Sequence, residues 1–101
     1  MKSVRLFVYG SLRRGRENHD ELEGARYVGA ARTEARYRLV QQQGYRALVE
    51  GDRTIEGELY DVNEELMDRL DAFEGNGYVR ATVMLADGSS AFAYWSAGGQ
   101  G

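Results

Sequence analysis

Two groups of residues in this sequence could together handle a substrate that carries a carboxylate. Residues 7–12, Phe-Val-Tyr-Gly-Ser-Leu, are an apolar segment that stops at a Gly-Ser pair. A glycine directly after a strand lets successive backbone N–H groups converge on an anion. In residues 71–75, Glu74 precedes a glycine at the end of a helical pattern. An anion-binding turn and a carboxyl group suited to proton transfer together indicate a small enzyme.

Glu74 is expected to have a raised pKa. The C-terminal end of a helix disfavours a negative charge, and Phe73 and Tyr78 could shield the carboxyl group from water. Both effects raise the pKa of a carboxyl group, and a glutamate near neutrality can accept and return a proton. Taken alone, an exposed acid at a helix end is the more common interpretation, since the chain has 16 acidic residues. For Gly10 alone, a tight turn without a ligand is likewise the more common one.

Other catalytic patterns fit this sequence poorly. Arg16 and Glu17 follow Gly15 where a P-loop needs Lys and then Ser or Thr, and no G-x-G-x-x-G occurs. Ser11 is not in a G-x-S-x-G elbow. A serine hydrolase could still pair Ser11 with His19, the only histidine, and His19 could alternatively join neighbouring acids at a metal. A surface histidine is the more common interpretation, and the hydrolase ranks last.

Length and composition predict one domain of residues 1–96, followed by a flexible tail of residues 97–101. The chain has 101 residues, of which 43% are hydrophobic, and no cysteine, which excludes disulfides and cysteine chemistry. The net charge of −3 argues against nucleic-acid binding. No stretch approaches 18 apolar residues, so we expect a cytoplasmic protein without a membrane segment.

The pattern of apolar residues predicts many short strands and one main helix. Leu66, Leu70 and Phe73 are spaced as one face of a helix. Asp61 and Glu64 resemble a capping box at its start. Strands are expected at 4–9, 27–31, 35–40, 45–50, 54–60, 79–86 and 91–95, with a helical turn at 19–22 and a hairpin turn at 87–88. This order of elements favours an α+β domain with a curved or barrel-like sheet.

Several segments in order resemble the gamma-glutamylcyclotransferase-like (AIG2-like) proteins, most closely their gamma-glutamylamine cyclotransferase branch. They are residues 7–12, 14–15, 18–19, 57–60 and 70–75, together with Tyr78-x-Arg80. The resemblance covers residues 4 to about 95, which is nearly the whole chain. One departure is Arg46, which stands after Tyr45 where many relatives have proline.

The resemblance implies a small mixed β-barrel with one main helix and short helical turns packed on it. It implies that Glu74 is the catalytic acid and base, and that the substrate is bound by Tyr9, Gly10, Ser11, Leu12 and Tyr78. The implied reaction cyclises a gamma-glutamyl amine or amide to 5-oxoproline and releases the free amine, without metal or cofactor. The alternative is a binding module of the same fold that holds a small carboxylate without turnover.

Overall fold

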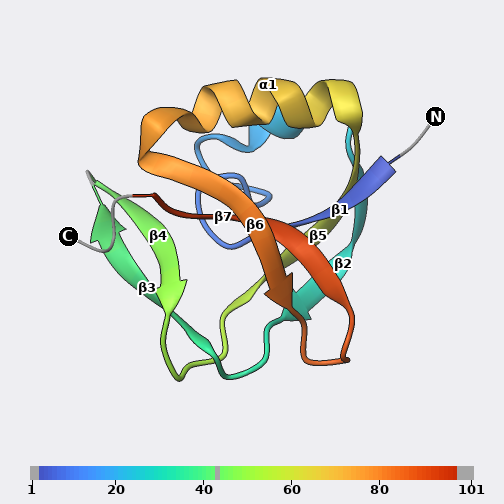
Figure 1. The fold of residues 1–101 in the computed structure, drawn as a ribbon. Coiled ribbons are helices and arrows are strands. Elements are labelled where there is room, and N and C mark those ends of the chain that lie inside the picture. The colour runs from blue at the N-terminus through green and yellow to red at the C-terminus, as the bar shows by residue number, and fades with distance from the viewer. Residues whose placement is uncertain (1–2, 43, 98–101) are drawn as a thin grey trace.

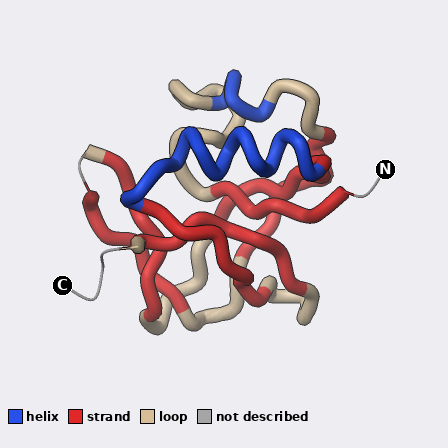
Figure 2. Tube along the Cα trace, turned by 45° about the horizontal axis from the view of Figure 1, so that its top comes forward, coloured by secondary structure: helices blue, strands red, loops and turns tan. Residues whose placement is uncertain are grey.

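A computed structural model gives the fold of residues 3–42 and 44–97. Within these residues the chain forms, in order, β1 (Ser3–Val8), η1 (His19–Leu22), β2 (Arg26–Arg32), β3 (Tyr37–Gln42), β4 (Tyr45–Glu50), β5 (Glu56–Asn63), α1 (Glu64–Glu74), η2 (Gly75–Gly77), β6 (Tyr78–Met84) and β7 (Ser90–Ser96). Figure 1 shows α1 lying across one side of the sheet. Figure 2 shows the loop with η1 on that same side.

The strands form one mixed sheet in the order β2-β5-β1-β7-β4-β3, and β6 pairs with β7. β5 runs antiparallel to both β1 and β2. β7 makes short parallel pairings with β1, at Leu6 and Phe92, and with β4, at Leu48 and Trp95. β7 therefore joins the end of β1, the β3–β4 hairpin and β6, which are the elements that later surround the candidate site.

Alternation along β1 feeds two hydrophobic cores. Leu6 and Val8 pack into the core under α1 and η1, while Phe7 and Tyr9 pack into the second core. Successive side chains of a strand point to opposite faces, and a strand covered on both faces is apolar throughout. The apolar run at the start of the sequence is therefore a central strand, and its position fixes where the following turn begins.

The predicted barrel is only loosely correct. The strand content and the single main helix of the described residues agree with the prediction, but the sheet is not closed. β2 and β6 approach each other only through the isolated bridge between Thr33 and Leu85, just beyond the two strands. The predicted strand at 45–50, the helical turn at 19–22 and the hairpin turn at Asp87-Gly88 are confirmed.

The predicted start of the helix is wrong by two residues. Asn63, rather than Asp61, is the N-cap, and its side-chain Oδ1 accepts a hydrogen bond from the Leu66 N–H at 2.8 Å. β5 continues to Asn63 because its last residues still pair with β1. Asn and Asp are both favoured N-caps, and the pairing with β1 decides between them.

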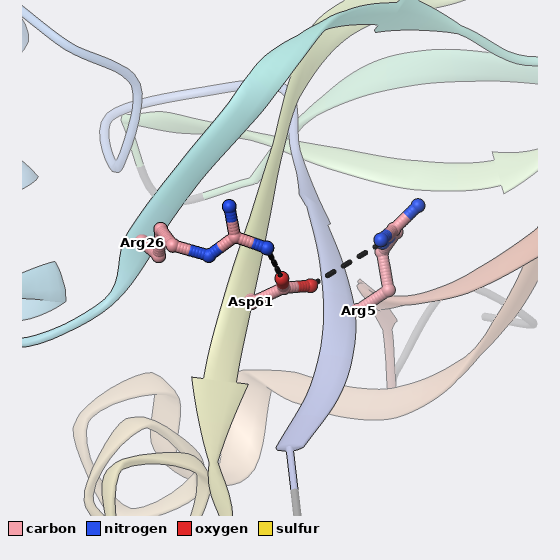
Figure 3. A network of polar contacts seen from close by, with 3 residues as sticks. All are labelled: Arg5, Arg26 and Asp61. Atoms are coloured by element: carbon pink, nitrogen blue, oxygen red, sulfur yellow. Dashed lines mark hydrogen bonds and ion pairs between the residues drawn. The ribbon is translucent and has the colours of Figure 1, made fainter.

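Asp61 instead forms ion pairs that link three strands. It lies in β5 between Arg26 of β2 and Arg5 of β1 and forms ion pairs with both (Figure 3). Arg5 Nε lies 3.4 Å from Asp61 Oδ1. Both arginine side chains are exposed, and such pairs contribute little to stability individually. The carboxylate is therefore a cross-strand contact and does not cap the helix.

At the C-terminal end, the Ala97 N–H donates to the Gly77 carbonyl at 3.0 Å. The rest of the predicted tail, residues 98–101, lies outside the described residues. None of the helices within 3–42 and 44–97 is long and apolar enough to cross a membrane.

Candidate active site

A cavity of about 380 Å³ opens beside the end of β1. It is bounded by the turn after β1, the end of α1, the start of β6, the end of β3 and the start of β4. All six residues predicted for the site line it: Tyr9, Gly10, Ser11, Leu12, Glu74 and Tyr78. The fold thus brings the turn and the glutamate, more than 60 positions apart, to one hollow.

Glu74 is the last residue of α1, and Gly75 stops the helix with a φ of +69°. A positive φ favours glycine at this position. The carboxyl group is partly buried, and this burial raises the pKa of Glu74 from 4.5 to about 7. The raised pKa predicted for Glu74 is therefore confirmed, with burial as its cause. A carboxyl group with such a pKa exchanges protons readily at neutral pH.

The turn after β1 is held by its carbonyl groups and leaves its N–H groups available. The Gly10 carbonyl accepts from Arg13 N–H at 3.1 Å, and the Ser11 carbonyl accepts from Asn18 N–H at 2.9 Å. Among the described residues, no acceptor receives a hydrogen bond from the N–H of Gly10, Ser11 or Leu12. A Cβ added at Gly10 would meet no atom within 4 Å, and its φ is not positive. The space beside Gly10 is therefore open, and backbone strain does not require glycine at this position.

Tyr9 and Tyr78 both use their hydroxyl groups to brace the cavity wall. The Tyr9 hydroxyl donates to the Tyr94 carbonyl at 2.5 Å and accepts from Leu48 N–H at 3.1 Å. The Tyr78 hydroxyl donates to the Arg46 carbonyl at 3.1 Å. Burial raises the pKa of both tyrosines. Both phenols therefore remain neutral at physiological pH, and Tyr9 offers a ligand no free hydroxyl donor.

The pairing of Ser11 with His19 that a serine hydrolase needs is absent. The Ser11 Oγ accepts from Asn18 Nδ2 at 2.8 Å. His19 Nδ1 lies 2.9 Å from the Leu12 carbonyl oxygen, so this nitrogen carries the proton and donates. The His19 ring packs beside Tyr60, with the ring centroids 5.9 Å apart. The hydrolase hypothesis is therefore wrong in its central geometric requirement.

The cavity is also lined by residues that were not predicted for the site. Their side chains come from the loop after the turn, the β3–β4 hairpin and β7: Asn18, Gln42, Tyr45, Arg46 and Tyr94. Asn18 could have been found, because it belongs to one of the family motifs. The others become neighbours only through the pairing of β4 and β6 with β7. In the described part of the chain, no three His, Cys, Asp or Glu side chains gather as a metal site.

The sequence matches the family model for gamma-glutamyl cyclotransferase, AIG2-like proteins over residues 6–100. A Vibrio cholerae protein with a provisional gamma-glutamylcyclotransferase name is 39% identical over 69 residues, which cover 68% of this chain and 60% of that protein. The gamma-glutamylaminecyclotransferase A of Danio rerio is 30% identical over 109 residues, covering 90% of this chain and 68% of that protein.

Solved structures with a similar fold are also found. The crystal structure of an uncharacterised protein from Pyrococcus horikoshii has a TM-score of 0.81 at 33% sequence identity, covering 94% of this chain and 79% of that chain. The AIG2-like protein of Mus musculus has a TM-score of 0.78 at 26% identity, covering 96% of this chain and 79% of that chain. The chain belongs to the gamma-glutamyl cyclotransferase, AIG2-like family.

Proposed function

We propose that this protein cyclises a gamma-glutamyl amine or amide to 5-oxoproline and releases the free amine. The observation that carries the proposal is the cavity in which Glu74, with a pKa of about 7, lies with the free N–H groups of Gly10, Ser11 and Leu12. Family membership supports the reaction class. The gamma-glutamylaminecyclotransferase name belongs to a relative, and it suggests the class of substrate to test.

In the proposed reaction, the α-amino nitrogen of the substrate attacks its own γ-carbonyl carbon. One C–N bond forms and closes the lactam, and the C–N bond to the leaving amine breaks. Two protons leave the α-ammonium nitrogen and end on the amine that departs, so no water or cofactor is consumed. Because nucleophile and electrophile belong to one molecule, holding the chain folded can lower the barrier by roughly 7–11 kcal/mol.

The residues of the cavity would divide this work between binding and proton transfer. The N–H groups of residues 10–12 would bind the α-carboxylate, as converging amides bind other anions. Glu74 would take a proton from the α-ammonium and return it to the leaving nitrogen. A carboxyl group that is half ionised near pH 7 serves both steps. Tyr78 would form the wall against which the folded glutamyl chain lies.

The direct test is to incubate the protein with gamma-glutamyl derivatives of lysine ε-amines, polyamines, amino sugars and amino acids. The proposal expects 5-oxoproline and the free amine to appear in equal amounts from at least one compound. Binding of 5-oxoproline or glutamate without turnover of any compound would favour the non-catalytic binding module. Neither binding nor turnover would contradict both hypotheses.

The pH dependence should report the pKa of Glu74. Because only the ionised carboxylate can accept a proton, kcat/KM should rise with pH and reach half of its plateau near pH 7. An ordinary exposed glutamate would place this midpoint near 4.5. Initial rates of 5-oxoproline release between pH 5 and pH 9 measure the profile. A midpoint near 4.5, the ordinary value for a glutamate, would show that Glu74 is not the base.

Replacing Ser11 or His19 with alanine should lower kcat/KM much less than removing the Glu74 carboxyl group. Alanine at position 11 keeps the backbone N–H and removes one hydrogen bond with Asn18, at a cost of about 0.5–1.5 kcal/mol. We expect each variant to retain more than about a tenth of wild-type kcat/KM. Assays on the same substrate measure this. A near-total loss of activity in either variant would support Ser11 as the nucleophile of the reaction.

A further inference from the structure

The hydrophobic anchoring of α1 ends one turn before Glu74. Leu66, Met67 and Leu70 are buried beneath the helix, each with 3% or less of its surface exposed. No residue from 71 to 74 is buried, and Phe73, which we expected on the packed face, is 42% exposed. Apolar packing therefore does not fix the turn of helix that carries the candidate catalytic glutamate.

Asp71 anchors this last turn by polar contacts to two strands. The Tyr94 hydroxyl of β7 donates to Asp71 Oδ1 at 2.7 Å, and Arg80 Nη2 of β6 lies 3.2 Å from Asp71 Oδ2. The Asp71 carbonyl also accepts the hydrogen bond from the Gly75 N–H that closes the helix. One residue thus fixes the last turn through both its side chain and its backbone.

The same hydrogen-bonded chain reaches the proposed anion-binding turn. The backbone carbonyl of Tyr94 accepts from the Tyr9 hydroxyl, which in turn accepts from the Leu48 N–H of β4. Tyr9 and Tyr94 are 7% and 5% exposed. Buried and fully paired networks of this kind hold their members rigidly. The end of α1 and the residue that opens the turn are therefore connected through two tyrosines.

We propose that Asp71 is a positioning residue that holds Glu74 across the cavity from the turn at residues 10–12. Among the described residues, the Glu74 carboxyl group has no hydrogen-bond or ion-pair partner that raises or lowers its pKa. With no such partner to hold the carboxyl group, the last helical turn sets the point from which the Glu74 side chain extends into the cavity. The proposal rests on the proposed function only for the role of Glu74, and the anchoring itself is testable without turnover.

The first test measures the protonation of Glu74 in three variants. Tyr94→Phe removes the hydrogen bond and keeps the Asp71 charge, Asp71→Asn removes the charge, and Asp68→Asn is the matched control at an exposed aspartate of the same helix. Protein with ¹³C-labelled glutamate is titrated by NMR. Burial raises the pKa values of Tyr9, Tyr78 and Tyr94, so none of these phenols ionises in the range around pH 7 where Glu74 is followed.

We expect the pKa of Glu74 to fall from about 7 towards 4.5 in Tyr94→Phe and in Asp71→Asn, because a loosened turn admits water. The control should keep the wild-type value. A fall in Asp71→Asn alone would be a charge effect and would contradict positioning. Thermal melting checks that each variant is folded. A lower melting temperature with an unchanged pKa of Glu74 would show a structural role only and would also overturn the proposal.

The second test uses steady-state kinetics on a substrate that the wild type turns over. Displacing a catalytic group by about 1 Å can cost roughly 10²-fold in rate. We therefore expect kcat of Tyr94→Phe and Asp71→Asn to fall about 10- to 100-fold, with KM changed less than about threefold. Unchanged kcat in both variants would overturn the proposal. If the wild type shows no turnover, the proposed function fails, and the NMR titration alone still decides the role of Asp71.

Discussion

Replacing Glu74 with glutamine should abolish measurable release of 5-oxoproline while leaving the fold intact. Glutamine has nearly the same shape but cannot accept a proton, and general acid–base groups are typically worth about 10²–10⁴ in rate. The loss should appear in kcat, because the amides of residues 10–12 remain able to bind the carboxylate. Side-by-side assays of wild type and Glu74→Gln on one gamma-glutamyl compound give the comparison.

The same variant should be at least as stable as the wild type at pH 8. Burial raises the pKa of Glu74 above its unfolded value of 4.5, so between pH 4.5 and about 7 the folded protein holds a proton that the unfolded chain has lost. The wild type therefore loses stability, relative to Glu74→Gln, as pH rises through this window. Glu65→Gln, at an exposed position of the same helix, is the control. For the activity prediction, release of 5-oxoproline by Glu74→Gln at the wild-type rate would show that Glu74 has no role in the reaction.

Gly57→Ala should be the most damaging small substitution for stability. A Cβ at Gly57 would lie 2.2 Å from the Val8 carbonyl oxygen and 2.8 Å from the Phe7 ring. β1 and β5 would have to separate where β1 leads into the turn, so the cavity would be distorted as well. Overpacking of this kind costs roughly 1–3 kcal/mol, and the clash with backbone places the expected loss near the upper end.

Gly29→Ala is the matched control for this prediction, because Gly29 also lies in a strand and a Cβ there would meet no atom within 4 Å. We expect the control to melt within a few degrees of the wild type. Urea unfolding of the two variants gives the difference in free energy of unfolding. Equal stability of Gly57→Ala and wild type would mean that β1 and β5 are not packed as closely as the structure has them.

Six of the residues that line the candidate site could be predicted from the sequence, because the two halves of that site carry local signals. A strand that ends at a glycine and a helix that stops at Gly75 can each be recognised from neighbouring residues. The resemblance to a family then joined these two signals into one site. Local patterns alone favoured an ordinary tight turn at Gly10 and an ordinary surface acid at Glu74.

The parts that could not be predicted depend on contacts between distant strands. Asp61 and Asn63 are both acceptable helix caps, and only the pairing of β5 with β1 selects Asn63. Asp71 and Tyr94 are 23 positions apart, and they meet because β7 packs below the end of α1. Phe73 has helical spacing but lines the cavity, since the packed face of the helix stops before it. Periodicity describes a face and does not say how far along the helix it remains covered.

The position of a bound product tests the central claim most directly. We expect a crystal structure of the protein with 5-oxoproline to show the product carboxylate within hydrogen-bond distance of the N–H groups of Gly10, Ser11 and Leu12. The lactam nitrogen should then lie beside the carboxyl group of Glu74, which took a proton from this nitrogen in the proposed reaction. A product bound outside this cavity, or bound with its carboxylate away from the turn, would contradict the proposed site.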